Sequence, residues 1–300
     1  MENLLSEFQE SLRNLGVSKK DRLLLAVSGG LDSAVLAGLC HTSALEFGIA
    51  HANFQLRGAE SERDEIFVCR LAGKYHVPFF TKKFDTLKFA ENEKCSVQVA
   101  ARTIRYAWFK TFIGKDPQHF KYLLTAHHLD DNIETMVMHF FRGTGISGLT
   151  GMPDKTGHLI RPLLNIPRKR LEEFAASREL EWVEDSSNAS NNYTRNFFRN
   201  QLIPAAATVF SDLYQNLKNN LYRFSEAEIL YQQAIGLHKK KLLKLEGTEV
   251  HIPILLLKKT APLKTILYEI IKDYHFSTAQ TNEVIRLMDS INGKYILGPT

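Results

Sequence analysis

The residues between Arg22 and about Leu164 alternate short apolar runs with longer segments of helical periodicity. The apolar runs are RLLLAV (22–27), EFGIAHA (46–52), VPFF (77–80), YLLTA (122–126) and HLIRPLL (158–164). The helical segments between them lie at 33–44, 60–75, 96–113 and 130–142. This order is typical of βαβ units, in which helices cover a parallel sheet. The sequence therefore predicts an α/β domain with a Rossmann-like parallel sheet, whose ligands bind beyond the carboxyl ends of the strands.

Strand patterns fade after about Pro204, and longer helical patterns follow. These patterns cover 213–245, as one or two helices, and then 262–274 and 278–290. We therefore predict two domains, 1–204 and 205–300, of which the second is smaller and mainly helical. The closing residues GKYILGPT resemble the start of a strand, so a further C-terminal domain is expected beyond Thr300, with a naturally short chain as the alternative.

The composition excludes several classes of protein. Hydrophobic residues make up 44% and charged residues 24%, as in ordinary globular proteins, and no run approaches the roughly 20 apolar residues of a membrane span. We therefore expect a cytoplasmic protein without a membrane partner. Cys40, Cys69 and Cys95 are too few and too widely spaced for a disulfide framework, a zinc ribbon or an iron–sulfur site, and we interpret them as core thiols. The net charge of +5 is small, so any RNA-binding surface must be local.

The most informative short motif is SGGLDS, which joins the apolar run LLLAV to the next helical segment. Its two glycines allow a tight turn with inward-pointing amides, and the following helix N-terminus favours an anion. A helix cap at Asp32 or Ser33 is the simpler alternative, and the spacing is not that of a Walker A loop. The whole hexapeptide, however, resembles the PP-loop of ATP pyrophosphatases, which cleave ATP between the α- and β-phosphates. The predicted ATP-binding residues are Ser28, Gly29, Gly30, Leu31, Asp32 and Ser33.

A second motif, TAHHLDDNIET, places Asp130, Asp131 and Glu134 at the start of a helix. Carboxylates there can hold Mg²⁺ against phosphates, or one of them can act as a base. An acidic first turn with Asp130 as its cap is the alternative. His127 and His128 also permit a transition-metal site, which we favour less because no third ligand is evident.

Two further segments supply arginines. In SVQVAARTIRYAWF, Arg102 and Arg105 share a helix face with Gln98, where they can meet phosphate or pair with acids on a solvated face. In DSSNASNNYTRNFFRNQLIP, Arg195 and Arg199 lie one helical turn apart and can also face phosphate. The apolar side chains of that segment are interpreted as core rather than as base-stacking groups. They are Phe197, Phe198, Leu202 and Ile203.

The remaining candidate residues lie in two segments, one after the strand predicted at 46–52 and one after the helix predicted at 130–142. HANFQLRGAESERDE contains His51, Asn53 and Arg57, although a capping pattern explains part of this segment. RGTGISGLTGM contains Gly143 and Gly145 in a loop where the backbone can approach a ligand or move, with a long connector as the alternative.

Seven motifs together resemble, in the same order, those of the tRNA(Ile)-lysidine synthetase family, over roughly residues 22–204. They are SGGLDS, HANFQLRG, SVQVAARTIRY, TAHHLDDNIET, RGTGISGLTGM, RPLL and TRNFFRNQLIP. The resemblance implies a ligase that acts on the wobble cytidine of the isoleucine tRNA with a CAU anticodon. ATP adenylates the oxygen on carbon 2 of the base, and free L-lysine then displaces AMP to give lysidine.

The resemblance also implies roles for individual residues. Those implied to be catalytic are Asp32, Arg102, Arg105, Asp131 and Glu134, with Asp32 and Asp131 as Mg²⁺ ligands. Those implied to bind substrate are His51, Asn53, Arg57, Gly143, Gly145, Arg195 and Arg199. The helices after residue 204 would grip the tRNA through its phosphates.

Two alternatives remain, and the oligomeric state, including a homodimer, is left open. Another PP-loop enzyme such as a tRNA thiolase would usually need catalytic or cluster-binding cysteines. A non-catalytic nucleotide-binding or RNA-binding module is disfavoured because both the phosphate loop and the acidic cluster are retained.

Overall fold

The computed structural model describes residues 2–114, 119–184, 194–291 and 293–298. Contacts within the chain define two compact units, Met1–Tyr222 and Arg223–Thr300. The predicted boundary after Pro204 falls inside the first unit. Among the described residues, no helix combines the length and apolar character needed to cross a membrane.

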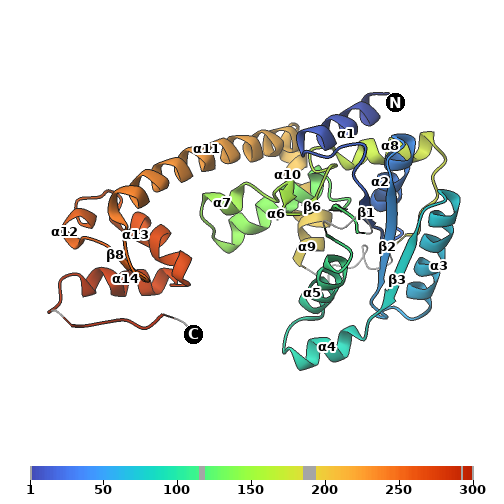
Figure 1. Ribbon diagram of the computed structural model, residues 1–300. Coiled ribbons are helices and arrows are strands. Elements are labelled where there is room, and N and C mark those ends of the chain that lie inside the picture. Colours follow the sequence, from blue (N-terminus) through green and yellow to red (C-terminus); the bar gives the residue numbers. More distant parts are fainter. Residues whose placement is uncertain (1, 115–118, 185–193, 292, 299–300) are drawn as a thin grey trace. The chain divides into compact units, whose positions relative to one another are not determined.

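The first unit is built on a six-stranded sheet in the order β3-β2-β1-β4-β6-β5. Figure 1 labels strands β1, β2, β3 and β6 of this sheet. The strands are β1 Leu23–Ala26, β2 Phe47–Asn53, β3 Phe79–Lys83, β4 Tyr122–Leu124, β5 Lys155–Thr156 and β6 Leu159–Ile160. Every neighbouring pair is parallel except β5 with β6. The predicted Rossmann-like parallel sheet is therefore confirmed, although the strand predicted at 158–164 is reduced to β6.

Ten α-helices are described in the first unit up to Val209. They are α1 Glu2–Asn14, α2 Leu31–Thr42, α3 Ala59–Lys74, α4 Thr86–Asn92, α5 Val97–Lys110, α6 Leu129–Arg142, α7 Ile146–Leu149, α8 Arg168–Ser177, α9 Thr194–Phe197 and α10 Ile203–Val209. A π-helical turn, Phe198–Leu202, joins α9 to α10. The four predicted helices are confirmed as α2, α3, α5 and α6. The predictions did not include α1, α4, α8 or α10, and α7 lies in the segment RGTGISGLTGM, which was predicted to be a loop.

Strand β1 shows why the sheet forms here. Leu23, Leu24 and Leu25 are all fully buried, although their side chains alternate between the two faces of the sheet. Leu23 and Leu25 pack into one hydrophobic cluster, and Leu24 packs into another with Phe109 of α5. A strand covered on both faces needs a continuous apolar run, which LLLA supplies.

The second unit has its own hydrophobic core, which includes Leu242, Leu257 and Ile270. The helices and strands from Leu213 onward are α11 Leu213–Leu242, β7 Lys244–Glu246, β8 Glu249–His251, α12 Ile254–Leu257, α13 Leu263–Ile271 and α14 Thr278–Leu287. The long helix and the later helical pair are confirmed, whereas the hairpin β7–β8 was not predicted. Residues 293–298 form no strand, so the strand start predicted in GKYILGPT is wrong for the described part of that segment.

The cysteines differ in their surroundings. Cys40 is fully buried in α2, and burial raises the pKa of its thiol. Cys69 on α3 is exposed and Cys95 is half-buried. The interpretation of all three as core thiols is therefore correct only for Cys40, because Cys69 lies on the solvent side of its helix.

Candidate active site

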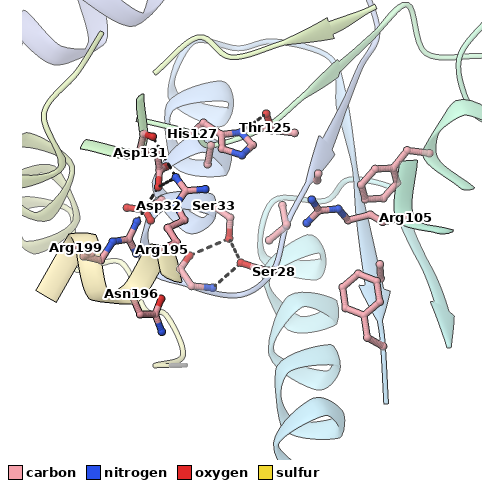
Figure 2. Close-up of a pocket in the computed structure, with 17 residues that line it drawn as sticks. Ser28, Asp32, Ser33, Arg105, Thr125, His127, Asp131, Arg195, Asn196 and Arg199 are labelled. Carbon is pink, nitrogen blue, oxygen red and sulfur yellow. Dashed lines mark hydrogen bonds and ion pairs between the residues drawn. The ribbon is translucent and has the colours of Figure 1, made fainter. Parts of the chain in front are cut away.

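A cavity of about 440 Å³ opens at the carboxyl ends of β1, β2 and β4 (Figure 2). The order of the sheet reverses between β1 and β4. Strands β2 and β3 lie on one side of β1, whereas β4 and β6 lie on its other side. Such a reversal leaves a crevice where ligands bind in open α/β sheets. The polar residues that line the cavity are Ser28, Asp32, Ser33, Arg105, Thr125, His127, Asp131, Arg195, Asn196 and Arg199.

The loop SGGLDS turns from β1 into α2 at the edge of this cavity. Gly29 has a φ of +101°, and a Cβ placed on it would lie 2.8 Å from Cγ2 of Val183. Two hydroxyl groups hold the turn. Ser33 Oγ donates to the Gly30 carbonyl at 2.9 Å, and Ser28 Oγ accepts from the Gly30 amide at 3.3 Å. The loop is thus shaped before any ligand arrives, with Gly30 as the N-cap of α2.

His128 connects this loop to the start of α6. Its side chain is 1% exposed, and its Nε2 lies 3.6 Å from Asp32 Oδ2 and 3.4 Å from Asp131 Oδ2. Burial lowers the pKa of His128, but Asp130, Asp32 and Asp131 outweigh burial and raise it to about 9. The raised pKa favours the protonated form of His128, which would attract the carboxylates that precede and follow it in the chain.

The side chains of Asp131 and Glu134 are held by two arginines from the segment around α9. Asp131 Oδ1 accepts from Nη2 of Arg195 and from Nη2 of Arg199, both at 2.8 Å. Glu134, which is 2% exposed, accepts from Nε of Arg195 at 2.7 Å and from Nε of Arg199 at 2.6 Å. Burial raises the pKa of Asp131, but His128 and the arginines outweigh it, so the pKa lies below its ordinary value.

The opposite wall of the cavity carries Arg105 from α5 (Figure 2). Its guanidinium lies 5.0 Å from the ring centre of Tyr106, and among the described residues its buried Nε has no hydrogen-bond partner. Burial, helped by nearby Arg102, lowers the pKa of Arg105. A buried cation without a carboxylate beside it favours an anionic ligand. Arg102 itself is exposed and does not line the cavity.

His127 is the neutral counterpart of His128. Burial lowers its pKa to about 4, and nearby arginines add to this shift against the opposing effect of Asp131. Its Nδ1 lies 2.9 Å from Thr125 Oγ1. Among the described residues, no three His, Cys, Asp or Glu side chains are arranged to hold a metal ion, so the transition-metal alternative gains no third ligand there.

The structure does not bring His51, Asn53 or Arg57 into the cavity wall. His51 is buried, with Nδ1 2.9 Å from the Val27 carbonyl at the end of β1. Asn53 Nδ2 donates to Glu65 at 2.7 Å, and Arg57 Nη2 donates to Asp64 at 2.9 Å. These contacts shape the loop after β2, and the assignment of the three residues to substrate binding stays a prediction.

The glycine-rich segment ends α6 and begins α7. Gly143 has a φ of +78° after the last turn of α6, and Gly145 is the N-cap of α7. His139 Nδ1 lies 2.9 Å from the Gly148 carbonyl, which ties α7 to α6. A Cβ on Gly143 or Gly145 would meet nothing within 4 Å, so the backbone there faces open space. Their substrate-binding role stays a prediction.

Residues 185–193, which begin the segment DSSNASNNYTRNFFRNQLIP, lie outside the described residues.

Sequence reasoning missed Arg168, at the start of α8. Its backbone amide donates to Asp130 Oδ2 at 2.9 Å, and its Nε lies 3.9 Å from Asp32 Oδ1. The signal for a helix start was present, since Pro167 stands immediately before a cluster of basic residues. Nothing in the local sequence indicated that this helix begins beside the phosphate loop.

Comparison with known families decides what kind of chain carries this site. Residues 2–206 match a family described as PP-loop domain, and residues 244–300 match one described as TilS substrate binding domain. A tRNA(Ile)-lysidine synthase of Chlorobaculum tepidum is 33% identical over 93% of this chain and 87% of its own length. The chain belongs to the tRNA(Ile)-lysidine synthase family. The family suggested by the seven motifs is thus confirmed.

Other family members are longer. The tRNA(Ile)-lysidine synthase of Bacteroides thetaiotaomicron is 34% identical over 91% of this chain, and that of Parabacteroides distasonis is 32% identical over 95%. The chain spans 63% and 64% of the lengths of these two relatives. A solved U34-tRNA thiolase from Methanococcus maripaludis has a TM-score of 0.58 at 15% identity, covering 75% of this chain and 79% of its own, and so shares the fold.

Proposed function

We propose that this chain ligates free L-lysine to carbon 2 of the wobble cytidine of a CAU-anticodon tRNA(Ile), using ATP. One observation carries the proposal. The cavity at the reversal of the sheet brings the PP-loop, Asp131 of α6, Arg195 and Arg199 to one place. This arrangement, in a chain of the tRNA(Ile)-lysidine synthase family, supports chemistry on a nucleotide phosphate beside a base.

The proposed reaction has two steps. The oxygen on carbon 2 of the cytidine attacks the α-phosphate of ATP, and pyrophosphate leaves. The ε-amine of lysine then attacks carbon 2, AMP departs with that oxygen, and the amine loses a proton. Adenylation is needed because a base carbonyl oxygen is a poor leaving group, whereas AMP leaves readily.

The cavity supplies groups suited to the phosphates of ATP. The amides of the SGGLDS turn and the N-terminus of α2 favour phosphate oxygens. Arg105 faces the cavity without a carboxylate partner in the described residues, so it is placed to stabilise charge that grows on the transferred phosphate. Arg195 and Arg199 fix the orientation of Asp131 and Glu134, so we assign the two arginines a positioning role.

We further propose that Asp32 and Asp131 hold Mg²⁺. Asp32 Oδ1 is buried and has no hydrogen bond among the described residues, although the Arg168 guanidinium lies 3.9 Å away, so its lone pairs are open to a closer cation. The ion would neutralise phosphate charge when ATP is bound. Phosphate oxygens would complete its coordination, so two protein carboxylates suffice.

The alternative of a tRNA thiolase shares the fold but finds no support in the cavity. No cysteine is among its lining residues. Cys40 is enclosed in α2, and exposed Cys69 lies on α3.

The decisive test of the proposal is the incorporation of labelled lysine into tRNA transcripts in the presence of ATP. We expect labelling of a CAU-anticodon tRNA(Ile) but not of the same transcript with uridine at the wobble position. Cytidine has an amino donor at carbon 4 where uridine has a carbonyl acceptor, so a buried acceptor in the pocket would reject uridine. Equal labelling of both transcripts, or labelling that does not need ATP, would refute the lysidine assignment.

Asp32→Asn tests the cation and phosphate assignment. The variant keeps the shape of the side chain and removes its charge, so we expect a folded protein with little ATP-dependent lysine transfer and a weaker response to added Mg²⁺. Thermal melting checks the fold, and pyrophosphate release measures the activity. Asp85→Asn, which alters the N-cap of α4, is the matched control and should leave the activity unchanged.

A further inference from the structure

An exposed group of phenylalanines lies beside the candidate active site. Phe140 and Phe141, in the last turn of α6, are 66% and 63% exposed, and Phe197 in α9 is 42% exposed. The rings form a chain of contacts through buried Phe198. The centroids of Phe141 and Phe198 are 5.6 Å apart, and those of Phe197 and Phe198 are 6.0 Å apart. We call the four rings the phenylalanine platform.

The platform lies on the same two chain segments that carry residues of the cavity wall. Phe197 stands between Arg195 and Arg199, which line the cavity and bind Asp131 and Glu134. Phe140 and Phe141 belong to the same helix as those carboxylates, and the open backbone of Gly143 follows them. A large ligand that enters the cavity would extend over surfaces formed by these same segments.

The charge around the platform selects the kind of partner. The segments 135–153 and 194–211 contain no aspartate or glutamate, and Arg142 is exposed at the end of α6. Exposed aromatic rings on segments that carry no aspartate or glutamate of their own suit a ligand that has flat bases and an anionic backbone. A surface built only for apolar packing against protein would not need this absence of negative charge.

We propose that the phenylalanine platform is a stacking surface for unpaired bases of the anticodon loop next to the reacting cytidine. This inference rests on the proposed function and adds where the flanking bases bind. Single-stranded bases stack on aromatic side chains whatever their identity, so the platform holds the loop without reading its sequence. Selection of cytidine remains with the cavity, where a base edge meets polar groups.

The test uses the full 300-residue chain and an RNA hairpin that carries the CAU anticodon loop. We expect Phe140→Ala with Phe141→Ala to weaken hairpin binding at least about five-fold, since stacking contributes about 1–3 kcal/mol per base. Phe140→Leu with Phe141→Leu should lose a similar factor, whereas Phe140→Tyr with Phe141→Tyr should retain affinity. Ile66→Ala, at a residue that is 59% exposed on α3, is the matched control and should bind normally.

Two further measurements separate stacking from other roles. The slope of log affinity against log salt should stay the same in the alanine variant, because no phosphate contact is lost. ATP binding and the melting temperature should also stay at wild-type values. Unchanged hairpin affinity in the alanine variant would overturn the platform, as would full affinity in the leucine variant. An alanine variant that turns a dimer into a monomer without losing RNA would assign the surface to a second copy of the chain instead.

Failure of the platform and failure of the proposed function give different results. A wild-type protein that labels tRNA with lysine but binds RNA independently of these rings contradicts only the platform. Ring-dependent binding of the hairpin without lysine transfer supports the platform as an RNA surface and contradicts the ligase. Absence of any hairpin binding by the wild-type protein overturns the platform, whereas the ligase is decided by lysine labelling of the full tRNA.

Discussion

Gly29 and Gly30 are adjacent in the SGGLDS turn, yet the backbone needs only one of them to be glycine. Gly29 has a φ of +101° and abuts Val183, whereas Gly30 has a φ of −70°, and a Cβ added to it would lie 3.6 Å from its nearest neighbour, Ser28 Oγ. Positive φ is accessible to glycine at little cost and strained for other residues. The phosphate turn therefore depends on glycine at the first position for its shape and at the second for access to the ligand.

This difference predicts unequal effects of two identical substitutions. We expect Gly29→Ala to lower the free energy of unfolding by about 1–3 kcal/mol, because it combines backbone strain with a clash at Val183. Gly30→Ala should lower it by at most about 1 kcal/mol, the scale of a helix-cap change. Urea unfolding of both variants measures the two losses in free energy of unfolding. Equal losses would contradict the assigned geometry.

At the scale of elements, α6 and α9 are joined by paired charges rather than by a shared sheet. Glu134 in α6 is almost fully buried and accepts hydrogen bonds from both Arg195 and Arg199. The arginines are 38% and 27% exposed, so water reaches them while the carboxylate stays enclosed. A buried carboxylate of this kind is tolerated because its partners are present.

The ion pairs predict coupling between α6 and the segment formed by α9 and the π-helical turn. Glu134→Gln should destabilise the protein by up to about 3–5 kcal/mol, with partial exposure of the arginines reducing the loss. Arg199→Leu should then cost less in the Glu134→Gln background than in the wild type, with a coupling of about 0.5–3 kcal/mol. A double-mutant cycle from urea unfolding measures this coupling free energy. Strictly additive losses would show that the two side chains do not interact.

At the scale of the whole molecule, the net charge of +5 is too small to attract RNA by itself. On the proposed function, local groups such as exposed Arg142, at the end of α6, would supply the attraction. The division into two units also follows the family matches, since residues 244–300, which match the TilS substrate binding domain, fall in the second unit.

Local phosphate contacts predict a salt-dependent affinity for tRNA. Each contact releases counterions from the RNA, so log affinity should fall linearly as log salt rises. Arg142→Gln should make this slope shallower by about one unit if Arg142 contacts a phosphate. Binding titrations at several salt concentrations give the slope, with Ile66→Ala as the control. A flat response in the wild-type protein would count against an RNA partner.

The sequence by itself determined the sheet, the main helices and the place of the phosphate loop. These features depend on local patterns, such as the fully apolar run of β1 and the glycines after it, which act through neighbours in the chain. Even the later helices were recognisable from their periodicity. The short hairpin β7–β8 was not, because its strands of three residues each are mostly exposed and leave little apolar pattern.

Only the tertiary structure decided which side chains meet. Arg195 binds Glu134 across 61 positions, a pairing that no local pattern encodes. Phe197 was interpreted as core, but it is 42% exposed, because the π-helical turn that follows buries Phe198 instead. Helix periodicity fixes which residues share a face, whereas the direction of that face depends on how distant segments pack.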